Sequence, residues 1–156
     1  MTFITTAGWV AQAVKGAVLH GDADTGIARV CTDARKTEPG DLFVGLRGER
    51  FDGTDFAADA AARGASAVMV SRLIEGINAV QIVVPDVNQA FCESAAAWRQ
   101  RFSIPVISVS GSNGKTTTTQ MIASILCEAY GRDGYLSTEG NFNNSVGVPI
   151  TLWRLR

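Results

Sequence analysis

The sequence predicts an α/β protein in which a small N-terminal α/β domain is followed by the start of a parallel-sheet domain that carries a phosphate loop. Short β-branched runs alternate with stretches whose apolar residues recur at helical spacing, and this alternation is typical of a parallel sheet. A glycine-rich segment, residues 111–114, lies between one such run and a helical stretch. The chain has 156 residues, of which 46% are hydrophobic and 19% charged, a composition typical of a folded protein.

The first half is expected to contain a helix, two strands, a second helix and two more strands. The β-branched runs, the capping residues and the glycine stops support each of these elements. In chain order they are a helix capped by Thr5 or Thr6 and ended by Gly16, strands at 27–31 and 42–46 joined by a polar turn at 38–41, an alanine-rich helix capped by Thr54 or Asp55 and ended by Gly64, and strands at 67–70 and 81–84.

A domain boundary is expected near residues 84–86, which gives one domain at 1–84 and a second at 85–156. Asp86 and Gln89 have the spacing of a capping box and predict that a helix begins there. After Pro105 the expected order is a strand at 106–109, the glycine-rich turn, an amphipathic helix and a strand at 135–137. A phosphate-loop domain of normal size needs more residues than these, so the chain is expected to be the N-terminal portion of a longer protein.

The glycine-rich turn reads Gly111-x-x-Gly114-Lys115-Thr116. Backbone N–H groups at a helix start have no intrahelical partner, so they favour an anion. Lys115 would then meet the β- and γ-phosphates of a nucleoside triphosphate, and the Thr116 hydroxyl would bind Mg²⁺. The turn is shorter than the common pattern, because Val109 stands where that pattern has its first glycine. The alternative is an ordinary tight turn whose lysine faces solvent.

A second unusual segment, residues 137–155, contains Asn141, Asn143 and Asn144 just after an expected parallel strand. Ligands of open α/β sheets bind at that end of the strands. Carboxamides there could bridge a phosphate, a metal-bound water and a substrate oxygen without adding charge. The alternative is an Asn/Gly turn, since both residue types tolerate a left-handed backbone.

Composition argues against several functional classes. The net charge is −1 and the basic residues are scattered, so we expect no nucleic-acid partner. No apolar run reaches the roughly 20 residues of a membrane-spanning helix, so no membrane insertion is expected. Cys31, Cys92 and Cys127 lack the spacing of a metal or redox motif and are expected to be free, buried thiols of a cytoplasmic protein.

Three segments in this order resemble the Mur ligases: CTDARKTEPGDLFVGLRGERFDGTDFA, GSNGKTTT and GNFNNSVGVPITLWRL. The resemblance implies the short phosphate loop and an ATP- and Mg²⁺-dependent ligase of peptidoglycan precursor synthesis. The last segment favours the family member that joins D-alanyl-D-alanine to UDP-N-acetylmuramoyl-tripeptide. In the implied reaction, the substrate carboxylate forms an acyl phosphate that the dipeptide amine then attacks.

The resemblance also implies roles for individual residues. Lys115 and Thr116 are the implied catalytic residues, with Thr116 as a metal ligand. The implied contacts to ATP come from the phosphate loop: Gly111, Ser112, Asn113, Gly114, Lys115, Thr116 and Thr117. The implied contacts to the uridine-linked substrate are Thr32, Asp33, Arg35, Gly48, Glu49, Arg50, Phe51, Asp52, Gly53, Asn141, Asn143 and Asn144.

The residues of the first domain admit two interpretations. Arg35 and Arg50 could donate hydrogen bonds to a pyrophosphate or ribose, while Gly48 and Gly53 would allow close backbone approach. The alternative is that both arginines are solvated surface charges. The sequence departs from the usual family pattern at Ala34, where the family has serine or threonine, and at Thr54, where it has histidine.

Several alternatives remain open. Another Mur-type amino-acid ligase and a non-catalytic module that binds a nucleotide or UDP-sugar both fit, and a phosphate-loop kinase or GTPase fits less well because of the asparagines. Mur ligases also need a further metal carboxylate, a modified lysine and a closing C-terminal domain. None of these lies within the 156 residues, so the chain alone is expected to be inactive. A monomer is expected.

Overall fold

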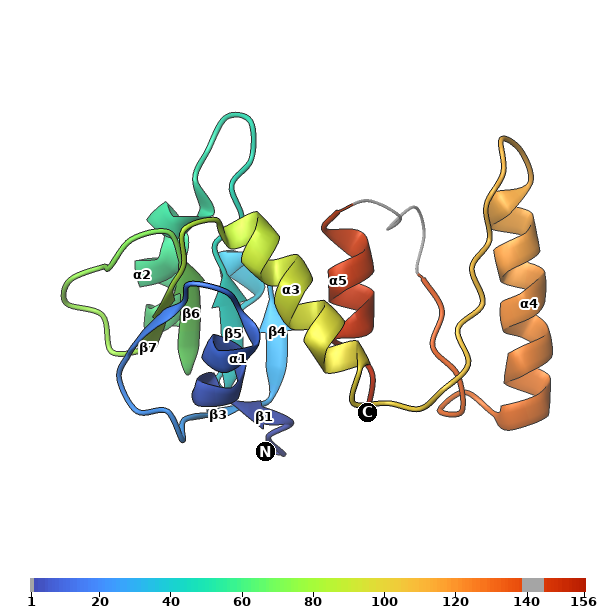
Figure 1. Cartoon of the computed structure of the whole chain (residues 1–156), viewed down its shortest axis with the longest axis horizontal. Coiled ribbons are helices and arrows are strands. Elements are labelled where there is room, and N and C mark those ends of the chain that lie inside the picture. The colour runs from blue at the N-terminus through green and yellow to red at the C-terminus, as the bar shows by residue number, and fades with distance from the viewer. Residues whose placement is uncertain (1, 139–144) are drawn as a thin grey trace.

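The structure is a computed structural model that describes residues 2–138 and 145–156 (Figure 1). Its elements follow one another as strands alternating with helices, which confirms the α/β class. In chain order they are β1 (Thr5–Thr6), α1 (Ala7–Ala13), β2 (Val18–His20), β3 (Gly26–Ile27), β4 (Arg29–Cys31), the 3₁₀ turn η1 (Ala34–Lys36), β5 (Asp41–Val44), the 3₁₀ turn η2 (Gly53–Phe56), α2 (Ala57–Ala62), β6 (Ala67–Val70), β7 (Val80–Val83), α3 (Val87–Arg99), α4 (Lys115–Tyr130) and α5 (Gly147–Leu152).

A five-stranded sheet in the order β2-β7-β6-β5-β4 forms the centre of the N-terminal part. Strands β4 to β7 are parallel, and β2 pairs antiparallel with β7 at one edge. Successive side chains of a strand point to opposite faces. Leu42 and Val44 therefore join the core under α1 and α3, whereas Phe43 joins the core under α2. Helices cover both faces of the sheet, as a parallel sheet requires (Figure 1).

Most elements predicted in the first half are present, but strands β1 and β2 were not predicted, and two predicted elements differ locally. The strand expected at 27–31 is interrupted at Ala28, because Ile27 pairs with β1 while residues 29–31 pair with β5. The alanine-rich helix is preceded by η2, whose cap is Asp52, so the expected cap at Thr54 or Asp55 is wrong. Thr54 is only 1% exposed, and its hydroxyl accepts a hydrogen bond from the Ser71 backbone N–H at 3.0 Å instead.

Helix α3 begins at the predicted cap. The Asp86 carboxylate accepts a hydrogen bond from the Gln89 backbone N–H at 3.0 Å. The Gln89 side chain donates to Glu93 rather than back to the cap, so only half of the capping box forms. Phe91 and Trp98 of α3 are buried in the same core as the sheet. The domain boundary expected near residues 84–86 precedes this helix and stays a prediction.

Three tryptophans join α5 to the N-terminal part. The rings of Trp98 and Trp153 stack with centroids 5.1 Å apart, and Trp9 meets them edge-on at 5.7 and 6.1 Å. The Trp98 indole N–H donates to the Leu155 carbonyl at 3.3 Å, and the Arg101 guanidinium lies 4.7 Å from the Trp98 ring centroid. The last described segment of the chain is therefore fixed on α3, as Figure 1 shows.

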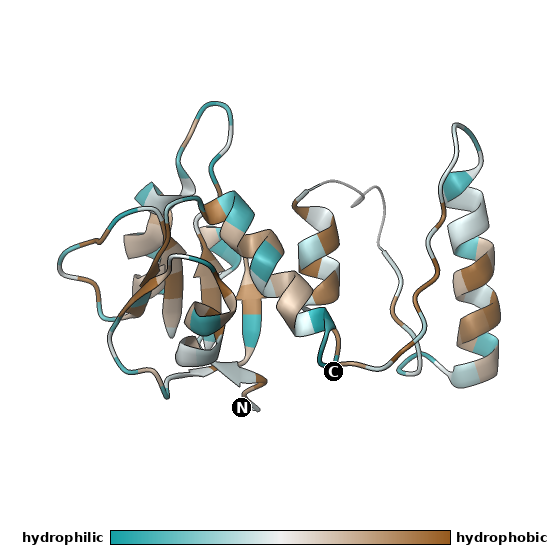
Figure 2. Cartoon of the chain, in the orientation of Figure 1, coloured by the Kyte–Doolittle hydropathy of each residue, from teal (hydrophilic) through white to brown (hydrophobic). Residues whose placement is uncertain are grey.

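Residues 103–138 extend away from this body and carry α4 (Figure 1). The strands expected at 106–109 and 135–137 are not strands in the structure, so both expectations are wrong for this chain. A strand is stable when a neighbouring strand supplies hydrogen bonds, and among the described residues no strand pairs with either segment, although Leu136 packs against the core of the body. None of the residues of α4 is buried, although apolar segments run along it in Figure 2.

Candidate functional site

The carboxyl ends of the parallel strands bring four segments to one edge of the sheet. Residues 32–37 follow β4, residues 45–53 follow β5, Ser71 follows β6 and residues 84–88 follow β7. Open α/β sheets bind their ligands at this edge, because loops and helix starts converge there. The sequence prediction placed uridine contacts in the first two of these segments.

An aspartate caps the helical turn after three of these strands. Asp33 accepts from the Arg35 backbone N–H at 3.0 Å, Asp52 from the Thr54 N–H at 2.9 Å, and Asp86 caps α3 as described above. The first backbone N–H groups of a helical turn lack a partner within the helix, and a carboxylate oxygen supplies one. Asp33 and Asp52, both predicted to contact substrate, therefore also have a structural role.

Arg35 forms a bidentate ion pair with Asp33. Its Nε and Nη2 atoms donate to the two carboxylate oxygens at 3.0 and 2.9 Å. These hydrogen bonds from Arg35 lower the pKa of Asp33 to about 2, and the carboxylate in turn raises the pKa of Arg35. The Arg35 side chain is 85% exposed, so the pair is a surface feature. A ligand that used Arg35 would have to share it with Asp33.

Gly53 allows the loop after β5 to cross itself. Its backbone N–H donates to the Leu46 carbonyl at 2.9 Å, and an added Cβ would lie 2.4 Å from that oxygen. The close approach expected at Gly53 is thus made to the chain's own backbone. A side chain at Gly48 would also be crowded, though less severely, because a Cβ there would lie 3.0 Å from the Phe51 ring.

A cavity of about 440 Å³ opens at this edge. Three predicted residues line it: Gly48, Glu49 and Asp52. The other lining residues were not predicted as site residues and are Arg47, Ser71, Pro85, Asp86, Val87 and Asn88. Ser71 directly follows β6 and Asp86 comes soon after β7. A polar residue just past a predicted parallel strand is therefore the sequence signal that could have identified both as lining residues.

The remaining predicted contacts of this part lie outside the cavity lining. Thr32, Asp33 and Arg35 follow β4 at the sheet edge, while Arg50 and Gly53 belong to the loop after β5. Phe51 is 59% exposed and meets Phe56 edge-on with ring centroids 6.3 Å apart. Asn141, Asn143 and Asn144 lie outside the described residues.

The phosphate loop ends in a left-handed glycine that starts α4. Gly111 and Gly114 have φ values of +146° and +77°, which favour glycine. Gly114 is the N-cap and offers no side-chain hydrogen bond to the helix. The Lys115 ammonium donates to the Gly111 carbonyl at 2.6 Å, so the side chain folds back over the loop. A positive charge and the start of a helix therefore meet at one point.

This arrangement fits a triphosphate. The backbone N–H groups of Lys115, Thr116 and Thr117 form the first turn of α4, where no carbonyl of the same helix can reach them. Ser112 and Asn113 are exposed in the loop. The exposed Thr116 hydroxyl would supply one oxygen to Mg²⁺. The described residues contain no group of three His, Cys, Asp or Glu side chains that could hold a metal.

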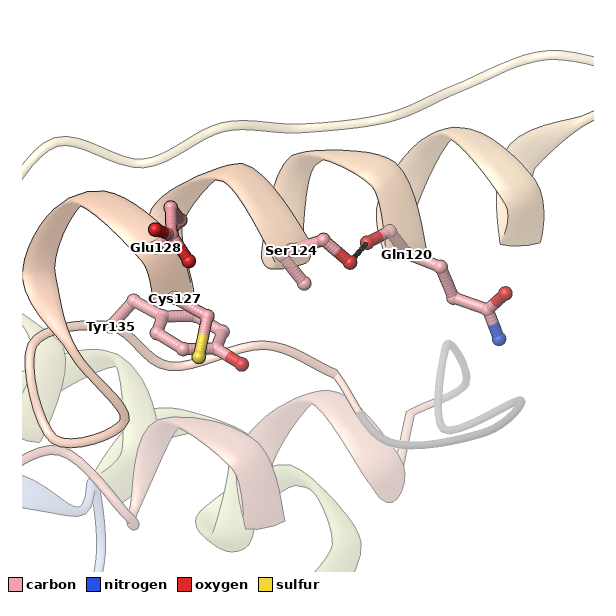
Figure 3. A pocket seen from close by; sticks show the side chains of 6 residues that line it. Gln120, Ser124, Cys127, Glu128 and Tyr135 are labelled. Atoms are coloured by element: carbon pink, nitrogen blue, oxygen red, sulfur yellow. Dashed lines mark hydrogen bonds between the residues drawn. The ribbon is translucent and has the colours of Figure 1, made fainter.

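A second hollow, of about 570 Å³, lies against the last turns of α4. Figure 3 shows Tyr135 beside Cys127 and Glu128 on one side of it, with Gln120 and Ser124 further along the helix. Desolvation and the neighbouring Cys127 raise the pKa of Tyr135. None of the predicted site residues lines this hollow.

Two further predictions concerned the burial of the cysteine thiols and the absence of a membrane-spanning helix. Cys31, Cys92 and Cys127 are free, but Cys92 is exposed and the other two are half-buried, so the expectation of buried thiols is wrong. Across the described ranges, no helix has the length and apolar character needed to span a membrane.

Comparison with known proteins gives consistent matches over both parts of the chain. The model of the Mur ligase family, catalytic domain, matches residues 26–110, and that of the Mur ligase middle domain matches residues 109–156. The UDP-N-acetylmuramoyl-tripeptide–D-alanyl-D-alanine ligase of Escherichia coli K12 is 46% identical over 141 residues, which cover 88% of this chain and 30% of that protein. The chain thus spans about 30% of the length of this relative.

Two solved structures extend the comparison. The crystal structure of MurF from Acinetobacter baumannii has a TM-score of 0.85 and 38% identity, and the match covers 97% of this chain and 33% of that one. The MurF ligase from Thermotoga maritima in complex with ADP has a TM-score of 0.68 and 30% identity over 82% of this chain and 29% of that one. The arrangement of the described residues therefore recurs in larger proteins.

Proposed function

The chain belongs to the Mur ligase family, and on this premise we propose that it is the N-terminal part of an ATP-dependent ligase that adds D-alanyl-D-alanine to UDP-N-acetylmuramoyl-tripeptide. Relatives named for this reaction support the choice of substrates. The observation that carries the proposal is the loop at the start of α4, where Lys115 and free helix-start N–H groups meet. The reaction serves peptidoglycan synthesis and, through it, cell-wall growth, cell shape and division.

The phosphate loop would make the first step possible. The terminal carboxylate of the tripeptide attacks the γ-phosphorus of ATP, so a carboxylate O–P bond forms and the bridging P–O bond to ADP breaks. Two anions must approach each other, and this repulsion opposes the step. Lys115 and the N–H groups of residues 115–117 would offset it where charge develops. Mg²⁺, bound in part by Thr116, would further neutralise the phosphates.

The second step releases phosphate. The amine of D-alanyl-D-alanine attacks the acyl carbon, the new N–C bond forms, and the C–O bond to phosphate breaks after a tetrahedral intermediate. The amine loses its proton to solvent or to a base outside the described residues. Lys115 would stabilise the charge on the departing phosphate, as it would on the γ-phosphoryl group in the first step. We propose that Asn141, Asn143 and Asn144 lie near the phosphates and the muramoyl substrate.

The cavity at the carboxyl edge of the sheet would hold the uridine end of the substrate. Its position at the ends of β5, β6 and β7 supports this, since nucleotides bind at such edges. In Figure 1 the loop after β5 and the phosphate loop both point to the upper side of the view. A long substrate with a nucleotide at one end and a peptide carboxylate at the other suits two such sites.

The location, the oligomeric state and the domain division are proposals too. Three free thiols are consistent with a reducing cytoplasm. We propose a cytoplasmic monomer with an N-terminal domain at residues 1–84 and the beginning of an ATP-binding domain at 85–156.

A second candidate is a non-catalytic module that binds a UDP-sugar. It is favoured by the contrast between the packed N-terminal sheet and α4, which buries none of its residues. ADP binding separates the two candidates, because only the ligase needs a nucleotide at the phosphate loop. A relative solved in complex with ADP makes ADP the suitable probe.

The test is calorimetry on the chain with UDP-N-acetylmuramoyl-tripeptide and, separately, with ADP and Mg²⁺. The ligase predicts two independent sites, each filled when the other ligand is already present. A chain that binds the uridine ligand but fails to bind ADP would support the module instead. If the uridine ligand fails to bind, both candidates are wrong.

A further inference from the structure

The last residue of α3, Arg99, holds the chain where it leaves the body for the outer arm (residues 103–138). Residues 100–114 belong to no helix or strand, so secondary structure does not fix the direction of this connection. The Arg99 guanidinium donates from Nη1 to the Phe102 carbonyl at 2.6 Å and from Nη2 to the Ile104 carbonyl at 2.9 Å. One side chain of the body thus holds the backbone on both sides of the boundary.

The two carbonyls differ in what else holds them. Phe102 is half-buried, and its ring meets the Trp98 ring edge-on with centroids 5.5 Å apart, so packing already fixes this residue. Ile104 is 43% exposed, so its side chain provides little anchorage. The ring of Pro105 favours an extended backbone at Ile104, and a direction set at this carbonyl is therefore passed on to the residues that follow. The hydrogen bond from Arg99 is the polar contact that fixes the backbone beyond Phe102.

The outer arm has a second contact with the body, at Leu136. Among the described residues of the arm, Leu136 alone packs against a hydrophobic core of the body. Burial of an apolar side chain is not directional. Two hydrogen bonds from one planar guanidinium restrict both position and angle. Of the two contacts, the one at Arg99 can therefore set an orientation.

This orientation matters because the arm carries the phosphate loop, whereas the cavity at the sheet edge belongs to the body. The proposed substrate has its nucleotide at one end and its reacting carboxylate at the other, so one molecule must span both sites. Reacting groups that are misplaced by about 1 Å can lose roughly 100-fold in rate. On the basis of the proposed function, we propose that Arg99 is a positioning residue that holds the outer arm, and with it the phosphate loop, at a set distance and angle from the cavity.

The experiment measures the distance between body and arm in the chain by double electron–electron resonance. Spin labels are attached at Ala58→Cys in α2 and Ala129→Cys in α4, two exposed positions. These helices lie at opposite ends of Figure 1, so a change in the direction of the arm changes the distance between the labels. The three native cysteines are replaced by serine, which keeps a hydrogen-bond donor at each position.

Arg99→Ala should widen the distribution of label distances about twofold, because the backbone at Ile104 regains the freedom that the guanidinium removes. Arg99→Lys should give an intermediate width, since an ammonium group keeps the charge but lacks the fork that reaches two carbonyls. Arg101→Ala is the matched control, because this guanidinium lies 5.4 and 4.7 Å from the centroids of the Trp9 and Trp98 rings instead of on the carbonyls. The control should retain the width of the parent.

A second measurement separates positioning from a role in folding or in either binding site. The affinities for ADP with Mg²⁺ and for UDP are determined on the same variants by calorimetry. Arg99→Ala should bind each ligand within about twofold of the parent, because distant sites with no shared partner act independently. Thermal melts establish that each variant is folded under the conditions of the distance measurement.

The inference is overturned by a parent-like width in Arg99→Ala, or in Arg99→Lys should the alanine variant fail to fold. It is also overturned by an equal widening in Arg101→Ala, which would mean that any change at the end of α3 loosens the arm. A parent chain with a distribution as broad as that of Arg99→Ala would show that the arm has no set position. If the chain binds neither ADP nor UDP, the proposed function is wrong, while the distances still decide whether Arg99 holds the arm.

Discussion

The packed body (residues 2–102 and 145–156) and the outer arm (residues 103–138) contain similar residues and differ in what covers them. All the buried hydrophobic residues that the structure describes belong to the body. The arm leaves Val106, Met121 and Ile125 between 62% and 67% exposed. Helical spacing of apolar residues predicts a face to be covered, but it does not say which segment covers it.

The two regions also use their helix starts differently. Three helical turns of the body, η1, η2 and α3, are capped by aspartates, which satisfy backbone N–H groups at the sheet edge, and α1 is capped by Thr6. Helix α4 starts at a left-handed glycine with no side-chain cap, so its first N–H groups stay available. A capped start contributes to stability, whereas an uncapped start next to a lysine suits an anion.

The largest expected effect is in the body. Trp153→Ala should lower the free energy of unfolding by about 3–5 kcal/mol, because it removes a ring that is 2% exposed and leaves a cavity beside Trp98 and Trp9. Urea unfolding followed by circular dichroism measures this. Trp153→Phe is the control and should cost less, since it keeps a ring and removes an indole N–H that has no partner among the described atoms. A loss below about 1 kcal/mol for the alanine variant would mean that α5 does not stabilise the body.

The sequence predicted the body well because its local signals agree with its long-range contacts. The strand at 67–70 and the cap at Asp86 needed only a β-branched run and a capping pattern. Thr54 was misassigned because its burial depends on Ser71, which lies 17 residues away. The arm was predicted less well, since a strand at 106–109 depends on neighbouring strands that the described residues do not include.

The parts of the candidate site that consist of neighbouring residues in the sequence could be predicted, and those that depend on distant contacts could not. The phosphate loop could be predicted because its residues are consecutive and their chemistry is specific, and its role stays a prediction. Gly48, Glu49 and Asp52 were predicted through the family resemblance; they line the cavity, and their contact with substrate stays a prediction. Asn88 was missed because its contact with Arg47 spans 41 residues, and a lone asparagine on a helix gives no local signal.

A smaller effect is expected in the arm. Ile125→Ala should change the free energy of unfolding by less than about 0.5 kcal/mol, because Ile125 is 66% exposed and makes little buried contact to lose. The same urea unfolding measurement applies, with Phe91→Ala in the body as the matched large-to-small change. If Ile125→Ala cost as much as Phe91→Ala, α4 would be packed against another surface in solution, and the contrast between arm and body would be wrong.

The pH effect should be local. The pKa of Asp33 lies at about 2, below its ordinary value of 3.8, because Arg35 donates hydrogen bonds to the carboxylate. A lowered pKa means that the contribution of the pair is complete above the ordinary value and is lost as the pH falls through about 2. An NMR titration of the Asp33 carboxyl should show this midpoint, and Arg35→Ala should raise it toward 3.8. An unchanged midpoint in the variant would mean that the ion pair does not form in solution.

The central claim is that the turn from Gly111 to Thr116 binds a triphosphate and is not needed for folding, and Lys115→Ala tests it most directly. Two quantities are measured on the same samples: the melting temperature without nucleotide, and the affinity for ADP with Mg²⁺. The Lys115 ammonium contacts only a loop carbonyl among the described residues, so its removal should change stability by less than about 0.5 kcal/mol. The affinity for ADP should fall about tenfold or more, because a charged hydrogen bond to phosphate is lost. A variant that melts early yet binds ADP like the parent would show that the loop is a structural turn and would contradict the account.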